Sequence, residues 1–529
     1  MIEMLSKRET GSFYTCSSVA DYISRWAISD PSQSLLEPSF GDGSFLYSAI
    51  SRFAELGQVS PHIYGVELQK APFLAFNNTG TDVSLLNHDF FDYFPNTLFD
   101  SIIGNPPYVR LKNLSLESRE KALAAMKAHN FHLPLNASLW MPFVVHATEL
   151  LKANGRLGFV LPYEITYVRY AFRLWDYLSS HFGSLSVIRV HEDFFPNVDV
   201  ETIIFLADNK GASTDTVHYL AYTSLSKLFA GNHVINTTVS IADICNMKRP
   251  FEQAMLHSET KSLLNQFKES GSIRPLINDC KFKIGYVCGD KYFFHPTPNI
   301  QNEYNLSDAN LLPCLRNAKE INGIPSIGVD THHAVSPSKL FYPATILPGD
   351  KAYIEFGESQ DVHKGFKCRN RSPWYITPSI EVPDLILTVF GDVPKLIAND
   401  GGFVVSNSLL SGIITSGQSK KEMICRWYNS LTLLMIELGI HSLGGGTLVL
   451  IPGEVDRLEI IAMVPEESIF DIYQALDICM IEKGASATYK AGDELVLRRL
   501  YHLSQQQIDS ICESLFFLRS WRNPTERRS

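Results

Sequence analysis

Residues 99–108 read Phe99-Asp100-Ser101-Ile102-Ile103-Gly104-Asn105-Pro106-Pro107-Tyr108, a short apolar run that ends abruptly at an amide, two prolines and a phenol. Ile102 and Ile103 favour a buried strand, whereas Pro106 and Pro107 lack the N–H donors that would extend a ladder. The Asn-Pro-Pro-Tyr loop is therefore predicted to project from the end of a strand. In open α/β sheets the carboxyl ends of the strands form the edge at which ligands bind.

This loop suits the methylation of a planar amino nitrogen, whose delocalised lone pair makes it a poor nucleophile. The side-chain oxygen of Asn105 and the carbonyl of Pro106 can each accept one N–H and so localise the lone pair, while Tyr108 offers a face on which a flat base can stack. An isolated Asn-Pro is more typical of a turn that closes a strand. The full tetrapeptide is expected by chance in roughly one of several hundred chains of this length, which favours the catalytic interpretation.

Length and composition indicate a globular protein with more than one domain, because 529 residues with 45% hydrophobic content can bury sizeable cores. No apolar run approaches the length of a membrane span, and the N-terminal residues lack the apolar core of a signal peptide. We therefore expect a cytoplasmic protein with no membrane contact. The nine cysteines form no C-x-x-C pair, which supports neither a disulfide framework nor a metal site.

The formal net charge of −10 excludes a broad polycationic surface, so any contact with nucleic acid must use a local basic region. The most basic stretch of the chain is 363–371, which is followed by Trp374 and Tyr375. Basic side chains interleaved with aromatic ones suit contacts with phosphates and bases. We expect four cations of this stretch to bind DNA: Lys364, Lys367, Arg369 and Arg371. The alternative interpretation is a charged surface loop.

A glycine turn follows the apolar pair Leu35-Leu36, and apolar residues at helical spacing come after it. Gly41 and Gly43 would let the backbone approach a ligand at the start of that helix. The third glycine of the dinucleotide fingerprint is absent, and the acids Glu37 and Asp42 would repel a pyrophosphate. A cationic nucleoside without phosphate fits better, and S-adenosylmethionine is such a ligand.

Two more acids follow predicted strands. Glu67 ends the run 63–66 about 20 residues beyond the glycine turn, where an acid can bind ribose hydroxyls. Asp89 follows the run 83–86, where it can accept a hydrogen bond from an adenine amino group while Phe90 stacks on the ring. Each acid alone is more typical of a solvated strand end. In series with the Asn-Pro-Pro-Tyr loop, they define one edge of one sheet.

The chain after the loop predicts a helix over 139–153, a turn at Asn154-Gly155 and a buried strand over 157–162. A strand over 185–190 then leads to Phe195, which is expected at the catalytic edge to stack on a base, with a core aromatic residue as the alternative. The run 202–206 follows too closely for a crossover helix and is predicted to pair antiparallel.

Taken together, residues 10–210 resemble the gamma-class adenine-N6 DNA methyltransferases of the TaqI type. One departure is Cys16, where that family usually has proline. The resemblance implies that S-adenosylmethionine binds at Thr15, Glu37, Gly41, Gly43, Glu67, Asp89, Phe90, Asn105 and Phe143. It implies that an extruded adenine binds at Asn105, Pro106, Tyr108 and Phe195.

These observations predict an α/β protein with a Rossmann-like class I methyltransferase sheet that has an antiparallel edge strand, followed by a mixed α+β target-recognition domain. The expected domains are 1–245, catalytic, and 246–529, DNA-reading. The expected function is N6-adenine methylation of a specific site in double-stranded DNA, by a monomer that protects DNA from a separate restriction endonuclease. The rival interpretations are a methyltransferase acting on RNA or on a glutamine amide, and a non-catalytic DNA-binding subunit that retains the fold.

Overall fold

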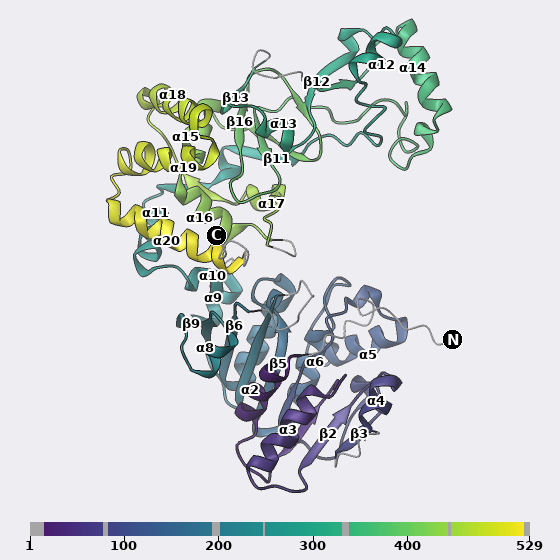
Figure 1. Ribbon diagram of the computed structural model, residues 1–529, viewed down its shortest axis with the longest axis vertical. Coiled ribbons are helices and arrows are strands. Elements are labelled where there is room, and N and C mark those ends of the chain that lie inside the picture. Colours follow the sequence, from purple (N-terminus) through teal and green to yellow (C-terminus); the bar gives the residue numbers. More distant parts are fainter. Residues whose placement is uncertain are drawn as a thin grey trace. The chain divides into compact units, whose positions relative to one another are not determined.

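The computed structural model describes residues 15–77, 83–192, 201–246, 249–330, 338–442 and 446–522. The chain divides into two compact units, Met1–Met255 and Leu256–Ser529 (Figure 1). The first contains the Asn-Pro-Pro-Tyr loop and the second contains the basic stretch 363–371. No helix among the residues described is long and apolar enough to cross a membrane.

One mixed sheet forms the centre of the first unit. Its strands are β1 Ser34–Glu37, β2 His62–Val66, β3 Ser84–Leu86, β4 Phe99–Gly104, β5 Leu151–Pro162, β6 Phe182–Val190, β7 Thr202–Lys210, β8 Thr216–Tyr222 and β9 Ile235–Ser240. They lie in the order β3-β2-β1-β4-β5-β7-β6-β8-β9. Since β3, β2, β1, β4 and β5 pair in parallel, their carboxyl ends share one edge.

Strand β1 lies where the strand order reverses. Leu35 pairs with Ile63 of β2 on one side and with Ser101 of β4 on the other. Ligands bind at such a switch point because the loops leaving the two neighbouring strands turn away from each other and open a crevice. Leu35 and Ile63 are buried, as expected for parallel strands covered on both faces.

Strand β7 runs antiparallel to both β5 and β6, which confirms the antiparallel pairing expected of the run 202–206. The sheet does not end there. It continues from β6 through the parallel neighbour β8 to the antiparallel β9. The α/β fold class expected from the sequence is confirmed, with a sheet that is wider than the strand pattern indicated.

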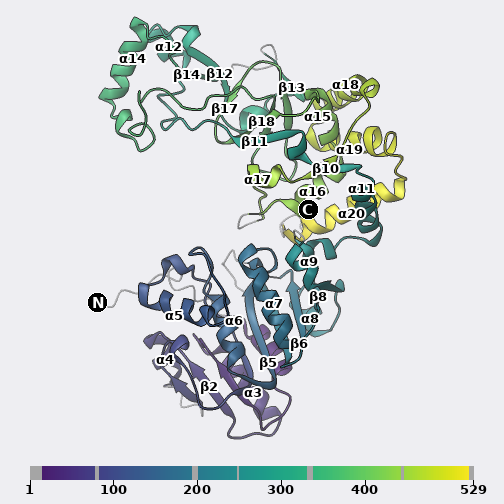
Figure 2. The same cartoon turned by 180° about the vertical axis from the view of Figure 1, so that it is seen from behind.

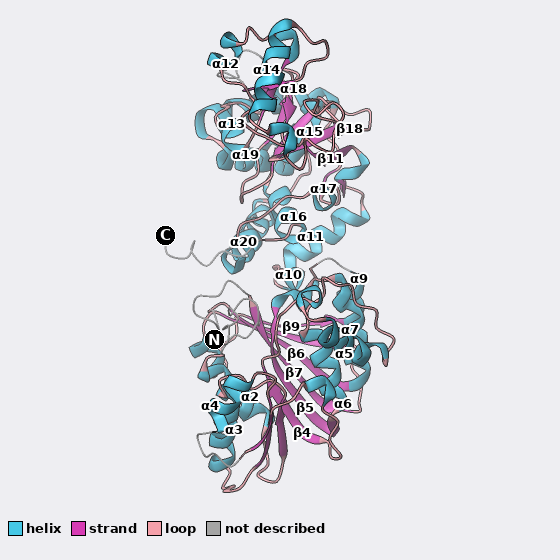
Figure 3. Cartoon of the chain, turned by 90° about the vertical axis from the view of Figure 1, so that its right-hand side faces the viewer, coloured by secondary structure: helices cyan, strands magenta, loops and turns pink. Residues whose placement is uncertain are grey.

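Helices cover both faces of this sheet (Figure 3). One face carries α2 Ser17–Ala27, α3 Ser44–Glu55 and α4 Lys70–Asn77, and the other carries α5 Leu116–Lys127, α6 Trp140–Glu149 and α7 Phe172–His181. Shorter helices are α8 Leu225–Phe229, α9 Ile241–Asn246 and α10 Pro250–Ala254. The apolar stripe of α2, including Val19 and Ile23, packs into the core with Phe45 and Leu46 of α3.

The helix expected over 139–153 is shorter than predicted. It ends at Glu149, and β5 begins at Leu151, which pairs with Phe99 of β4. The next paired residue of β5 is Arg156, so residues 152–155 bulge out of the ladder, with Asn154 at φ +61°. The predicted turn is thus a bulge within one strand. Pairing with β4 captures Leu151, and this tertiary contact outweighs local helix propensity.

The described part of the second unit contains three small sheets, which confirms a mixed α+β domain. The sheets are β10 Ile273–Pro275 with β19 Glu459–Ile461; β11 Cys280–Ile284, β18 Leu409–Ile414, β15 Leu385–Thr388, β16 Leu396–Asn399 and β13 Gly328–Val329; and β14 Ser338–Phe341, β12 Leu311–Leu315 and β17 Val404–Val405. The helices are α11 Ser258–Glu269, α12 Pro298–Glu303, α13 Ala318–Asn322, α14 Pro348–Ser359, α15 Lys420–Trp427, α16 Ser430–Gly439, α17 Pro452–Val455, α18 Glu466–Lys483, α19 Ala485–Gly492 and α20 Gln505–Arg522.

Within the second unit, α12, α14, β12 and β14 group together at one end, away from α18 (Figure 2). We call this part the aromatic lobe. Its core contains Phe293, Phe341 and Tyr353, against which Trp374 packs. The rings of Phe293 and Tyr353 stack with centroids 4.7 Å apart. The aromatic lobe therefore has a hydrophobic core of its own, and the basic stretch 363–371 belongs to it.

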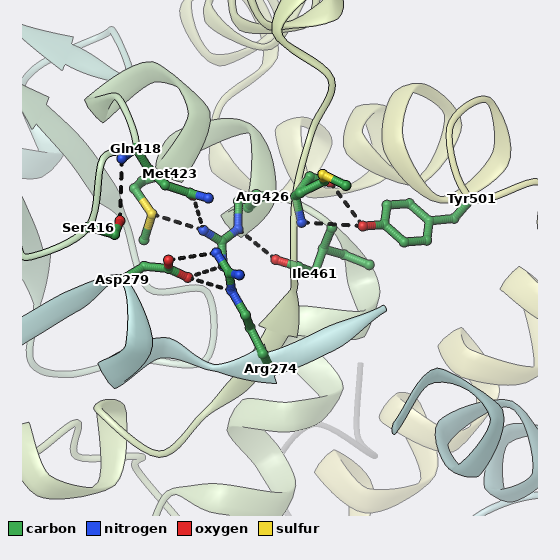
Figure 4. Close-up of polar contacts among 9 residues, drawn as sticks. Arg274, Asp279, Ser416, Gln418, Met423, Arg426, Ile461 and Tyr501 are labelled. Carbon is green, nitrogen blue, oxygen red and sulfur yellow. Dashed lines mark hydrogen bonds and ion pairs between the residues drawn. The ribbon is translucent and has the colours of Figure 1, made fainter. Parts of the chain in front are cut away.

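A buried ion cluster joins three elements of the second unit (Figure 4). The side chain of Arg426, in α15, is 0% exposed and donates from Nη2 to Oδ2 of Asp279 at 2.7 Å. Arg274, in β10, binds the same carboxylate at 2.6 and 2.9 Å. The Nε of Arg426 donates to the carbonyl of Ile461 in β19 at 2.6 Å. Asp279 thus compensates a guanidinium that water does not reach.

We expect Asp279→Ala to lower the free energy of unfolding by about 3–5 kcal/mol, because it leaves the buried charge of Arg426 unpaired. The matched control is Glu355→Ala, which breaks an exposed pair with Lys351 (3.9 Å) and should cost less than about 1 kcal/mol. Urea denaturation of the full chain, followed by tryptophan fluorescence, measures both. Equal midpoints for the two variants would show that the buried cluster contributes no more than a surface pair.

Candidate active site

The turn between β1 and α3 requires glycine at two positions. Gly41 has φ +52° and Gly43 has φ +82°, both in the left-handed region that other residues rarely adopt. A Cβ atom built on Gly43 would lie 2.2 Å from the ring of Phe76. The strand, tight turn and helix predicted from the sequence are present, and the turn opens on the carboxyl edge of the sheet.

Glu37 ends β1 at this edge and is 1% exposed. A Cβ atom built on Gly104, the last residue of β4, would lie 3.5 Å from Cγ of Glu37, so the side chain lies beside the start of the Asn-Pro-Pro-Tyr loop. Burial, together with the nearby acids Asp42 and Glu67, raises the pKa of Glu37 well above its usual range. Its Oε2 atom has no hydrogen-bond partner among the residues described.

Glu67 follows β2 and is also buried. Its Oε2 accepts from the backbone N–H of Gly41 at 2.9 Å, and its Oε1 accepts from that of Gln69 at 2.7 Å. Burial raises the pKa of Glu67, although these two hydrogen bonds act in the opposite direction. Glu67 therefore holds the glycine turn against the end of β2.

Thr15 precedes α2 and is buried, and its Oγ1 has no hydrogen-bond partner in the described part of the chain. The next residue is Cys16, with φ −62° and ψ 140°. A proline ring would hold φ close to the same value. The backbone at Cys16 therefore keeps the φ angle that a proline would impose.

Asp89 follows β3 and accepts a hydrogen bond from the backbone N–H of Phe91 at 3.1 Å. Lys121, in α5, lies 3.8 Å from the same carboxylate. The adjacent ring of Phe90 is buried and packs on Phe143 of α6, with centroids 4.9 Å apart and planes at 31°. The structure thus brings Phe90 and Phe143 together as one aromatic wall.

The Asn-Pro-Pro-Tyr loop is held at both ends. The hydroxyl of Ser39, in the glycine turn, donates to the backbone carbonyl of Asn105 at 3.3 Å. The hydroxyl of Tyr108 donates to the carbonyl of Val160 in β5 at 3.1 Å, and burial together with the charge of Glu164 raises the pKa of this phenol well above its usual range. Pro106, between them, is buried. The loop is therefore hydrogen-bonded to the glycine turn after β1 at one end and to β5 at the other.

Sequence reasoning missed a group of polar residues beside this loop. Glu164 lies in the 3-10 turn η3 Tyr163–Thr166, immediately after β5, and accepts hydrogen bonds from Arg110 and Trp140. A signal was present in the sequence, because Glu164 lies within three residues of the end of the buried run 157–162, as Glu67 and Asp89 do after theirs. Its partners Trp140 and Tyr170 lie in separate segments, which the local sequence pattern does not bring together.

Phe195, expected at the same edge, lies outside the described residues. The basic stretch 363–371 lies within the described residues, and its four cations fall into two groups. Lys367 and Arg369 extend from the aromatic lobe and lie 5.8 and 5.3 Å from the exposed ring of Phe366, and Lys364 pairs with Asp361 at 2.8 Å. The fourth expected contact, Arg371, turns inward instead, where it donates to the carbonyls of Val287 and Cys288 at 2.5 Å.

The donor set at the sheet edge fits a cationic ligand. Three carboxylates converge on the ends of neighbouring strands: Glu37, Glu67 and Asp89. Glu37 is buried without a compensating cation among the described residues. An anionic phosphate would be repelled, whereas a cation with hydrogen-bond donors would lower the cost of burying Glu37. A sulfonium nucleoside such as S-adenosylmethionine meets these conditions.

Two family models match this chain. The model "Eco57I restriction-modification methylase" matches residues 61–195, and the model of the C-terminal domain of the type II methyltransferase M.Eco57I matches residues 248–497. The type II methyltransferase M.AccI of Acinetobacter calcoaceticus is 24% identical over 406 residues, which cover 74% of this chain and 73% of that protein. M.HincII of Haemophilus influenzae is 28% identical over 225 residues, which cover 42% of this chain and 41% of that protein.

The fold is similar to that of a solved type IIL restriction-modification enzyme, MmeI, in complex with DNA. The TM-score is 0.51 at 12% sequence identity, and the match covers 95% of this chain and 75% of that one. At this identity the likeness concerns the fold.

We expect Glu37→Gln to stabilise the ligand-free protein increasingly as the pH rises. The raised pKa of Glu37 means that its contribution to stability is fully present below the unfolded pKa of about 4.3 and is lost as the pH rises through the folded pKa. Glutamine carries no such ionisation cost. Melting temperatures of wild type and variant between about pH 5 and 9 should therefore diverge with increasing pH.

The matched control for that measurement is Glu55→Gln. Hydrogen bonds from Arg25 lower the pKa of this exposed carboxyl, so its loss should not stabilise the protein at high pH. If the difference in melting temperature between wild type and Glu37→Gln is the same at every pH, Glu37 does not carry an uncompensated buried charge.

Proposed function

We propose that this chain, whose residues 61–195 and 248–497 match the two Eco57I-family methyltransferase models, methylates the N6 amino group of adenine in double-stranded DNA. One observation carries the proposal. Strands β1, β2, β3 and β4 bring Glu37, Glu67, Asp89 and Asn105 to a single edge of one sheet. We also propose membership of the gamma class, which rests on the Asn-Pro-Pro-Tyr loop.

The base side of the site is the loop itself. An adenine stacked in a duplex cannot bring its amino group to a buried edge, so the base must be extruded. Asn105 and the carbonyl of Pro106 then accept the two amino protons, which localises the nitrogen lone pair for attack. Tyr108, held by Val160, provides one stacking face, and we assign the opposite face to Phe195.

The cofactor side is the acidic edge. When bound, S-adenosylmethionine supplies the methyl group from a sulfonium centre. We propose that Glu67 accepts from the ribose hydroxyls and that Asp89 accepts from the adenine amino group. Gly41 and Gly43 allow close approach of the backbone. The remaining residues proposed to line this side are Thr15, Glu37, Phe90, Asn105 and Phe143.

We propose that residues 1–245 perform catalysis and that residues 246–529 read the DNA sequence. Lys364, Lys367 and Arg369 are exposed on the aromatic lobe, where they suit contacts with phosphates. Arg371 is proposed to have a different role, because its guanidinium is already committed to two backbone carbonyls. We further propose that the protein acts as a cytoplasmic monomer and protects the host DNA from a separate restriction endonuclease.

The test of this function is single-molecule sequencing of DNA from cells that lack adenine methylation and express the protein. We expect N6-methyladenine at one short sequence. Asn105→Ala should reduce its formation by orders of magnitude, because one of the two acceptors for the amino protons is lost, while binding of S-adenosylmethionine measured by calorimetry persists. Methylation at cytosine, in RNA or on a protein would overturn the proposal, as would normal methylation by the Asn105→Ala variant.

The DNA-binding role of the basic stretch is tested with a duplex of random sequence over a salt series. Replacing Lys367 and Arg369 by Ala should shallow the dependence of log affinity on log salt by about one to two units, because phosphate contacts are lost. Arg371→Ala should instead lower the melting temperature, because two carbonyls lose their donors. Identical slopes for wild type and the double variant would show that the cations form only a solvated loop.

A further inference from the structure

Four side-chain hydrogen bonds converge on Glu164 beside the Asn-Pro-Pro-Tyr loop. Its Oε2 accepts from Nη2 of Arg110 at 2.8 Å. Its Oε1 accepts from Nη1 of Arg110 at 3.3 Å, from Nε1 of Trp140 at 2.9 Å and from the hydroxyl of Tyr170 at 2.9 Å. The Glu164 side chain is 14% exposed. Both carboxylate oxygens are thus used within the protein, with a bidentate guanidinium as the strongest partner.

The donors come from three different segments. Arg110 lies two residues after Tyr108, at the exit of the loop. Trp140 is the first residue of α6 and is fully buried. Tyr170 lies in the 3-10 turn η4 Arg169–Ala171. Glu164, at the end of β5, therefore joins the loop exit to α6 and to the turn before α7.

The guanidinium of Arg110 has further partners. It donates to the carbonyl of Asn136 at 3.2 Å and to the hydroxyl of Tyr170 at 3.1 Å. Although burial acts in the opposite direction, the charges of Glu164 and Tyr170 raise the pKa of Arg110. The group thus forms a connected polar network, in which removal of one member weakens the remaining bonds.

Helix α6 links this network to the cofactor side. Trp140 begins the helix, and one turn later Phe143 packs on Phe90 beside Asp89. The charge of Glu164 also acts on Tyr108, whose pKa it raises after the larger effect of burial. The same carboxylate thus lies close to the stacking phenol of the loop and bonds the helix that carries the aromatic wall.

We propose that Glu164 is a positioning residue, which sets the placement of the Asn105–Tyr108 loop relative to α6 and so the placement of the extruded base relative to the methyl donor. This inference rests on the proposed function. Among the residues described, the side-chain hydrogen bonds of Glu164 come from Arg110, Trp140 and Tyr170, and none joins it to the acids of the cofactor edge. Its loss should therefore change the rate of transfer and leave the affinity for S-adenosylmethionine unchanged.

The decisive variant is Glu164→Gln, which keeps the volume but removes the negative charge and replaces one acceptor oxygen by an NH2 group that cannot accept from Arg110. We expect kcat to fall roughly ten- to hundred-fold, because small misplacements of reacting groups cost about that much. The dissociation constant for S-adenosylmethionine, measured by calorimetry, should stay within about two-fold, because Glu67 and Asp89 are untouched. The substrate is a duplex with the methylated sequence identified by sequencing.

The matched control is Glu149→Gln. Glu149 is the last residue of α6, its side chain is 43% exposed, and it accepts from the hydroxyl of Tyr177 at 2.6 Å without contacting the loop. Its kcat should equal that of wild type. Glu164→Asp, which keeps the charge on a shorter side chain, should recover part of the lost rate.

Tyr170→Phe covers the case in which Glu164→Gln does not fold, because it removes a single donor from the network. We expect a several-fold loss of kcat with unchanged cofactor affinity. A wild-type rate in both Glu164→Gln and Tyr170→Phe would overturn the inference, and so would an equal loss of rate and cofactor affinity, which indicates general disruption of the pocket. An inactive wild-type protein, or methylation that survives Asn105→Ala, would instead overturn the proposed function on which this inference rests.

Discussion

The parallel pairing of β1 with β2 on one side and with β4 on the other is the constraint on which the site depends. It places the ends of strands that are distant in the sequence side by side, so Glu37 and the loop after Gly104 lie next to each other. Local structure alone could not achieve this, because β2 and β3 lie between β1 and β4 in the sequence. The Asn-Pro-Pro-Tyr loop and the acids Glu37 and Glu67 are consequently parts of one edge.

That edge is electrostatically costly in the free protein. Glu37 is buried near two other acids, and burial raises the pKa of its carboxyl because the ionised form is poorly solvated there. Glu67 is better satisfied because two backbone N–H groups point at it. Negative charge that the fold itself does not compensate is a physical basis for selecting a cationic ligand over a phosphate-bearing nucleotide.

The second unit shows how little can be inferred from the number of basic residues. Arg426 is completely buried on Asp279, and Arg371 donates to two carbonyls, so neither guanidinium is directed to solvent. In contrast, Lys367 and Arg369 remain exposed around Phe366. With a net charge of −10, the protein must rely on a few such exposed cations wherever it contacts DNA.

The central strands, the glycine turn and the loop at their edge could be predicted from the local pattern of residues, because apolar runs ending in Gly, Asp, Glu or Asn-Pro-Pro carry their own signal. That pattern also indicated the antiparallel pairing of 202–206. The end of α6 at Glu149 depends on long-range pairing, since Leu151 pairs with Phe99 of β4. The tertiary structure likewise decided the inward turn of Arg371 and the bonds that converge on Glu164. These outcomes depend on partners distant in the chain, and the pattern of neighbouring residues contains no information about them.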